Sequence, residues 1–147
     1  MTREGLPRIL FLCTGNSCRS QMAEGLARHH LGSILEPFSA GTRPKGIDPR
    51  ASRAMKEIGM ELDGQSSKSI DDVDLESLDL IITVCADADE NCPVVPAKCR
   101  VEHQGFDDPP RLAADCTDEE SAMKHYRRVR DQIERFIIEL PSTGILG

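Results

Sequence analysis

Strand-like segments alternate with segments of helical spacing along the sequence, and this alternation limits the chain to few folds. The strand-like segments are residues 8–12, 36–40, 80–84 and 99–103. Apolar residues recur with helical spacing over residues 20–31, 48–58 and 118–140. Strands and helices in alternation predict βαβ units around a parallel sheet. We therefore predict an α/β fold of three layers, with helices on both faces of a four-stranded parallel sheet.

Capping and turn residues delimit the predicted helices. Gly32 and Gly59 follow helical segments and are typical C-terminal stops, whereas Asp48-Pro49 is typical of an N-cap and the first helical position. Residues 86–91 suit a short helix, residues 73–78 suit one helical turn, and we interpret residues 106–110 as a loop. At 147 residues the chain has the length of one domain, so we expect residues 1–147 to form a single domain.

The charge balance excludes some classes of partner. Acidic residues outnumber basic ones by 25 to 18, and the formal net charge is −7. Because nucleic-acid binding depends largely on Lys and Arg that neutralise phosphates, we expect no nucleic-acid partner. An anion site in such a chain must be local, built from backbone N–H groups and a few basic side chains. No apolar run reaches the length of a signal-peptide core or a membrane span, so we expect a cytoplasmic protein with no membrane partner.

Residues 13–20, with the sequence Cys-Thr-Gly-Asn-Ser-Cys-Arg-Ser, carry the strongest chemical signal. They lie between a predicted strand and a predicted helix, where a loop of small residues can direct backbone N–H groups toward a tetrahedral oxyanion. Arg19 adds a guanidinium that can bind two oxygens. The same donors, with the Ser20 hydroxyl, stabilise a thiolate at Cys13 and make it a nucleophile. The expected oxyanion-binding residues are Thr14, Gly15, Asn16, Ser17, Cys18, Arg19 and Ser20.

Residues 13–20 can also be interpreted as a segment with no catalytic role. A cysteine and an arginine separated by five residues occur together by chance, and a buried cysteine at the end of a strand is common. The strand before the loop, its small residues and the helix after it favour the catalytic interpretation.

The cysteines need individual explanations, because they occur in a chain without a secretion signal. There are six, at positions 13, 18, 85, 92, 99 and 116. Such cysteines favour catalysis, redox cycling or metal binding over a disulfide framework. Cys85 follows the predicted strand 80–84, and the carboxyl ends of parallel strands share one edge of a sheet, so Cys85 and Cys13 can converge. Zinc bound by four of Cys85, Cys92, Cys99, His103 and Cys116 is an alternative, but the spacings differ from the short Cys-x2-Cys pairs of structural sites. We expect no metal and no cofactor.

The sequence from Ile9 to Gly25 resembles the low-molecular-weight protein tyrosine phosphatase superfamily, and more narrowly the thioredoxin-linked arsenate reductases of that fold. Phosphatases of the superfamily usually carry Pro where this chain has Gln21. Residues 83–93, Thr-Val-Cys-Ala-Asp-Ala-Asp-Glu-Asn-Cys-Pro, resemble the redox segment of the reductases. Residues 103–109, His-Gln-Gly-Phe-Asp-Asp-Pro, resemble the loop that carries the general acid, although Asp and Pro are also common in ordinary turns.

The resemblance implies an enzyme of arsenical detoxification that reduces arsenate to arsenite. In the implied reaction Cys13 attacks arsenate, and Asp108 assists loss of the leaving oxygen. Cys85 then attacks the sulfur of Cys13, and Cys92 attacks Cys85. Thioredoxin reduces the final Cys85–Cys92 disulfide. A helix over residues 85–92 would hold the two Cα atoms about 10 Å apart, beyond the ~7 Å that a disulfide tolerates, so we expect this segment to unwind on oxidation.

Two other functions remain alternatives at this point. A phosphatase acting on phosphotyrosine or a small phosphomonoester needs only Cys13, Arg19 and Asp108, and such activity can coexist with arsenate reduction. A non-catalytic oxyanion or redox sensor would keep the loop at residues 13–19 but would not need Asp108.

The resemblance also bears on potassium. Some relatives bind this ion beside the loop through positions that match Asn16, Glu24, Ser39 and residue 68. Residue 68 is Lys here rather than a carboxylate. We therefore expect the Lys68 ammonium to take the place of the cation, and activity without strong potassium dependence.

Overall fold

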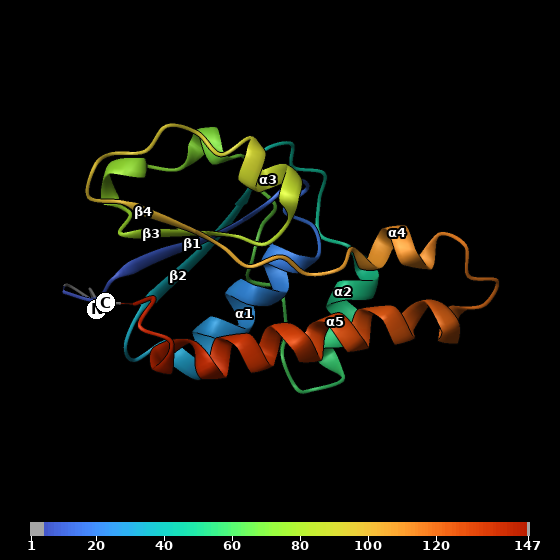
Figure 1. Ribbon diagram of the computed structural model, residues 1–147. Coiled ribbons are helices and arrows are strands. Elements are labelled where there is room, and N and C mark those ends of the chain that lie inside the picture. The colour runs from blue at the N-terminus through green and yellow to red at the C-terminus, as the bar shows by residue number, and fades with distance from the viewer. Residues whose placement is uncertain (1–4, 147) are drawn as a thin grey trace.

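A computed structural model describes residues 5–146 and confirms the predicted α/β class. Its four strands form one parallel sheet in the order β2-β1-β3-β4 (Figure 1). The strands are β1 (Arg8–Cys13), β2 (Glu36–Gly41), β3 (Leu80–Thr83) and β4 (Arg100–His103). Each lies within one or two residues of the segment predicted from the sequence.

Helices cover both faces of this sheet (Figure 1). Three of them lie below the sheet in the view of Figure 1: α1 (Arg19–Leu31), α2 (Pro49–Lys56) and the long α5 (Glu119–Glu139), which packs along α1 and α2. The short α3 (Ala86–Glu90) lies above it, with the 3₁₀ turns η1 (Ile70–Asp72) and η2 (Leu75–Ser77). None of the helices within residues 5–146 is long and apolar enough to cross a membrane.

Burial explains why the central strands were easy to recognise. The side chains of Ile9 to Leu12 in β1 and of Leu80 to Ile82 in β3 are at most 1% exposed, because both faces of these strands are covered. Such strands are apolar throughout. The four residues of β4 are all exposed, since this strand forms an edge of the sheet, and its sequence signal is correspondingly weak.

The structure corrects the interpretation of residues 106–110 as a loop. A short helix, α4 (Pro109–Ala113), begins within that segment and packs against α5. Proline suits the first turn of a helix, where its missing N–H would be unpaired in any case. Two consecutive prolines therefore mark a helix start here. The expected turn at residues 73–78 is confirmed as the 3₁₀ turn η2, and a further 3₁₀ turn, η1, precedes that range. Each turn is capped by the side chain of the preceding residue, Asp74 for η2 and Ser69 for η1. After α5 the chain continues in a third 3₁₀ turn, η3 (Leu140–Ser142).

The register of the sheet brings the chemically important segments together. Leu12 of β1 lies opposite Thr83 of β3, and the N–H of Val84 donates to the carbonyl of Leu12 at 2.9 Å. On the other side of β1, Cys13 lies opposite Gly41 of β2. The segments that follow these three strands therefore leave the sheet side by side at its carboxyl edge.

Candidate active site

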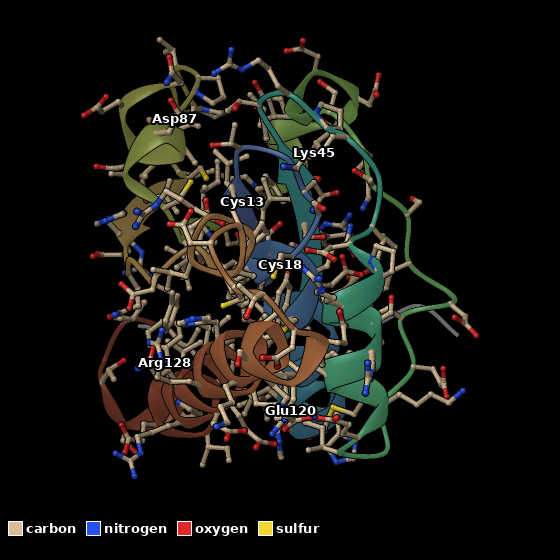
Figure 2. All side chains as sticks on the ribbon, turned by 90° about the vertical axis from the view of Figure 1, so that its right-hand side faces the viewer. Cys13, Cys18, Lys45, Asp87, Glu120 and Arg128 are labelled. Atoms are coloured by element: carbon tan, nitrogen blue, oxygen red, sulfur yellow. The ribbon has the colours of Figure 1, made fainter. Side chains whose placement is uncertain are left out.

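A cavity of about 260 Å³ opens at the carboxyl end of β1, where the loop at residues 13–19 enters helix α1. In the view of Figure 2, Cys13 lies between Asp87 on the left and Lys45 on the right. The lining residues are Cys13, Thr14, Gly15, Ser17, Cys18, Arg19, Arg43, Lys45, Asp87, Asp108 and Pro110. The loop expected to bind an oxyanion therefore forms much of the cavity wall.

Cys13 is 3% exposed, and its sulfur has a specific hydrogen-bond partner. Its Sγ lies 2.8 Å from the Oγ of Ser20, in the first turn of α1. The Nδ2 of Asn16 donates to the same Oγ at 2.9 Å. Because Ser20 accepts from Asn16, its single hydroxyl proton is available for a hydrogen bond to the sulfur.

A network of buried polar side chains holds the loop from below. Asn16 adopts a positive φ of 42° and donates to the Oγ of Ser39 on β2 at 3.0 Å. Ser39 donates in turn to the Oε1 of Glu24 at 2.5 Å. Gln21 donates to the carbonyls of Asn16 and Ser66, each at 3.0 Å. These bonds fix a backbone conformation that non-glycine residues rarely adopt.

Gly41 shows how closely the end of β2 approaches this loop. A Cβ at this position would lie 2.6 Å from the carbonyl oxygen of Thr14 and 2.8 Å from the N of Asn16. Both contacts are shorter than van der Waals distances, so a larger residue would displace the loop.

The prediction that the Lys68 ammonium takes the place of the cation is wrong. Its Nζ donates to the carbonyl of Ser66 at 2.8 Å on an exposed part of the surface. The cation that pairs with Glu24 is Arg28, one helical turn along α1, with 2.7 Å between Nη2 and Oε2. The sequence analysis overlooked Arg28 because it considered only the positions that match the potassium ligands of relatives. It did not consider the residue four positions after Glu24 on the same helix.

Arg19 connects the loop to the segment that carries Asp108. Its Nη1 donates to the carbonyl of Phe106 at 3.0 Å, and its Nη2 lies 3.5 Å from the Oδ1 of Asp108. Asp108 lines the cavity and is partly exposed, whereas Arg19 is mostly buried. The neighbouring Asp107 is held from α5 by Arg128 at 3.0 Å. Contacts with α1 and α5 thus hold the segment that carries Asp108 at the cavity.

Cys85 lies close to Cys13 but outside the cavity wall. It is 6% exposed, and its Sγ is 3.5 Å from the Oγ1 of Thr14, the residue next to Cys13. It also occupies the N-cap position of α3, where the N–H of Ala88 donates to its sulfur at 3.4 Å.

Cys92 lies beyond the other end of α3 and is half-buried. Burial raises the pKa of its thiol, and the nearby carboxylate of Asp89 raises it further. Side chains of α3 tie this helix to the strand ends. Thr14 donates to Asp87 at 2.7 Å, and Thr83 donates to Asp89 at 3.1 Å. In this arrangement Cys85 and Cys92 are separated by the whole of α3.

The other thiols stand apart from this chemistry. Burial raises the pKa of Cys18 well above its usual range, with Asp48 as the next cause, so Cys18 is an unreactive thiol despite its place in the loop. The pKa of Cys99 is also raised by burial. Within residues 5–146, no group of three or more His, Cys, Asp or Glu side chains is arranged to hold a metal ion. The zinc arrangement considered from the sequence has no counterpart there.

Four residues of the cavity wall were missed by the sequence analysis: Pro110, which follows Asp108 closely, and the charged residues Arg43, Lys45 and Asp87. A signal for them was available. Arg43 and Lys45 follow β2, as Asp87 follows β3, and the carboxyl ends of parallel strands share one crevice. The same argument that placed Cys85 near Cys13 therefore applies to them.

Comparisons with known proteins agree with this geometry. The family model described as low molecular weight phosphotyrosine protein phosphatase matches residues 8–143. An arsenate reductase of Bacillus subtilis is 47% identical over 136 residues, which are 92% of this chain and 96% of that protein. A solved structure of an arsenate reductase in the phosphate binding state superposes with a TM-score of 0.72 at 26% identity, covering 93% of this chain and 98% of the other. A thioredoxin-dependent arsenate reductase from Corynebacterium glutamicum gives a TM-score of 0.69 at 26% identity, covering 97% of this chain and 63% of the other.

Proposed function

This chain belongs to the low molecular weight phosphotyrosine protein phosphatase family, and we propose that it acts within that family as a reductase of arsenate, regenerated by thioredoxin. The observation that carries the proposal is the placement of two thiols around Thr14. Cys13 lines the anion cavity, and the Sγ of Cys85 contacts the side chain of Thr14, the next residue along the chain. A phosphatase needs the first thiol only, so the second is explained best by redox chemistry.

The first step is attack of the Cys13 thiolate on arsenic. Arsenate is held by the loop and by Arg19, which exchanges its contact with Asp108 for the oxygens of the anion. A sulfur–arsenic bond forms, and an oxygen of arsenic leaves as water after protonation by Asp108. Asp108 lines the same cavity as Cys13, so the acid and the nucleophile act on one bound anion.

The second step transfers electrons to arsenic. Cys85 attacks the sulfur of Cys13, so a sulfur–sulfur bond forms and the sulfur–arsenic bond breaks. The electron pair of the broken bond stays on arsenic, which leaves as arsenite. Cys92 then attacks Cys85, which forms the Cys85–Cys92 disulfide and releases the Cys13 thiolate. The dithiol of thioredoxin reduces that disulfide by exchange.

The position of α3 requires a conformational change in this sequence of steps. A helix between Cys85 and Cys92 holds their Cα atoms about 10 Å apart, which is too far for a disulfide. The five-residue α3 must therefore unwind, and its contacts with Thr14 and Thr83 must break. A helix this short has little stability of its own, so the unwinding costs little.

The test is arsenate reduction with thioredoxin, thioredoxin reductase and NADPH, in wild type and in single Cys→Ser variants. We expect Cys13→Ser and Cys85→Ser to release no arsenite. Cys92→Ser should release about one arsenite per molecule and then stop with a Cys13–Cys85 disulfide, because the transfer to arsenic precedes the role of Cys92. Cys116→Ser is the matched control and should keep full activity. Sustained turnover in Cys92→Ser would contradict the three-cysteine sequence.

Phosphatase activity is a second candidate, because Cys13, Arg19 and Asp108 line one cavity. These groups suffice for hydrolysis of a phosphomonoester through a cysteinyl-phosphate. Hydrolysis of p-nitrophenyl phosphate that persists in Cys92→Ser but disappears in Cys13→Ser would establish it as a separate activity.

A further inference from the structure

We infer that Arg43 and Lys45 form a basic wall at the mouth of the cavity that attracts a small, doubly charged oxyanion in its free form. This inference rests on the proposed function and deepens it, because it assigns the residues that select the substrate. Both side chains line the cavity that contains Cys13, and both are exposed. Neither belongs to the loop at residues 13–19.

Backbone hydrogen bonds place this wall beside the loop. The N–H groups of Arg43 and Lys45 donate to the carbonyls of Thr14 and Gly15, at 2.8 and 3.0 Å. The segment that follows β2 is therefore hydrogen-bonded to the loop through its backbone. These bonds fix the backbone of both residues at the edge of the cavity.

The stem of Lys45 is also fixed in place. A Cβ built on Gly15 would lie 2.9 Å from its Cε and 3.1 Å from its Cγ, so the aliphatic stem lies directly over this glycine. Glycine at position 15 makes room for the stem, and packing of the stem reduces the freedom of the ammonium at the mouth. Figure 2 shows Lys45 across the mouth from Asp87, with Cys13 between them.

The charges of this wall are available to a ligand. Within residues 5–146, neither Arg43 nor Lys45 makes an ion pair with a carboxylate, whereas Arg19 pairs with Asp108. The chain as a whole carries a net charge of −7 and repels anions. Unpaired positive charge at the mouth of a concave site raises the local anion concentration and the association rate.

The shape of the cavity favours a free oxyanion over phosphotyrosine. None of its lining residues is aromatic, so the ring of phosphotyrosine would find no stacking surface. A volume of about 260 Å³ holds a tetrahedral anion and several waters, since a water occupies ~30 Å³. The wall thus offers charge to the anion and no apolar contact to a larger group.

The test compares alkylation of Cys13 by negatively charged iodoacetate and by neutral iodoacetamide, read by peptide mass spectrometry. The ratio of the two rates reports the electrostatic potential at the cavity. In Arg43→Gln/Lys45→Gln we expect this ratio to fall about fivefold at low salt. The difference should shrink toward 0.5 M NaCl, because added salt screens exposed charges.

Inorganic phosphate serves as the ligand in a second readout. Its affinity is measured by protection of Cys13 from iodoacetamide, and we expect about fivefold weaker protection in the double variant. Lys56→Gln/Lys124→Gln is the matched control: it removes the same charge from two exposed lysines that make no ion pair within residues 5–146. This control should behave as wild type in both readouts.

The outcomes separate this inference from the proposed function. An unchanged ratio and unchanged phosphate affinity in Arg43→Gln/Lys45→Gln would overturn the inference, even if arsenate is reduced. Equal losses in the control would overturn it too, because only the net charge would then matter. If the wild-type protein fails to reduce arsenate but binds phosphate more tightly than Arg43→Gln/Lys45→Gln, the inference is supported and the proposed function is contradicted.

Discussion

Ser20 connects Cys13 to the buried polar network beneath the loop. Its Oγ contacts the Sγ of Cys13 and accepts a hydrogen bond from the Nδ2 of Asn16. The hydroxyl proton of Ser20 is therefore available to the sulfur. Asn16 is itself held by Ser39 and, through it, by Glu24. The orientation of one hydroxyl therefore depends on a chain of buried groups that reaches β2.

This arrangement predicts that Ser20→Ala slows alkylation of Cys13 by iodoacetamide at pH 7. A hydrogen bond to a charged group contributes about 1.5–3 kcal/mol, so we expect a rate at least about tenfold lower. Ser33→Ala, at an exposed position after α1, is the control and should react as wild type. An unchanged rate in a correctly folded Ser20→Ala protein would show that the backbone N–H groups and Arg19 are sufficient for the thiolate.

At the scale of elements, α3 separates Cys85 from Cys92, the two thiols of the proposed disulfide. It has only five residues, and threonines at the ends of two neighbouring strands hold its Asp87 and Asp89. Asp89 lies outside the cavity wall and acts on Cys92 in two ways. It tethers the helix through Thr83, and its charge raises the pKa of the Cys92 thiol in addition to the larger effect of burial.

Asp89→Ala is therefore expected to make Cys92 more reactive. A raised pKa means that Cys92 holds its proton at pH values where an ordinary thiol begins to ionise, so removal of Asp89 should shift its alkylation profile toward lower pH. We expect a rate at pH 7.5 about threefold to tenfold higher, together with faster deuterium exchange over residues 86–91. Glu90→Ala, on the same helix and exposed, is the control. Unchanged exchange and reactivity would mean that neither the tether nor the charge restrains this helix.

The elements also show what the sequence could predict and what it could not. Strands β1 and β3 were recognised because burial on both faces leaves a continuous apolar run, and the anion loop because its residues are contiguous. The short helix α4 was missed because its signal is a pair of prolines rather than a periodic pattern. Arg28 and the basic wall were missed for another reason. The i+4 spacing from Glu24 and the position after β2 made them candidates, but the sequence alone does not show which cation pairs with Glu24 or that the segment after β2 is bonded to the loop.

For the molecule as a whole, one buried contact joins the covering helices to the anion loop. The hydroxyl of Tyr126 on α5 donates to the Oδ2 of Asp48 at 2.5 Å, and the Oδ1 of Asp48 caps α2 by accepting from the N–H of Arg50. The backbone N–H of Asp48 donates to the carbonyl of Ser17 in the loop. Through Asp48, the long helix, the cap of α2 and the anion site are thus connected.

Tyr126→Phe should destabilise the whole protein, because it leaves the Asp48 carboxylate without its phenol partner and changes no packing volume. A hydrogen bond to a charged group contributes about 1.5–3 kcal/mol, so we expect a Tm lower by roughly 5 °C. Burial and the bond to Asp48 raise the pKa of Tyr126 above its usual range. The contribution to stability is therefore fully present below the unfolded pKa of about 10 and is lost as the pH rises above it.

The chain has one tyrosine and no tryptophan, so tyrosinate absorbance reports on this residue alone. In the folded protein we expect that absorbance to appear only together with the loss of helical circular dichroism at alkaline pH. Ionisation near pH 10 in a protein that keeps its helical signal would show that the phenol is accessible. Asp48 would then have to hold the loop and the cap of α2 without help from α5.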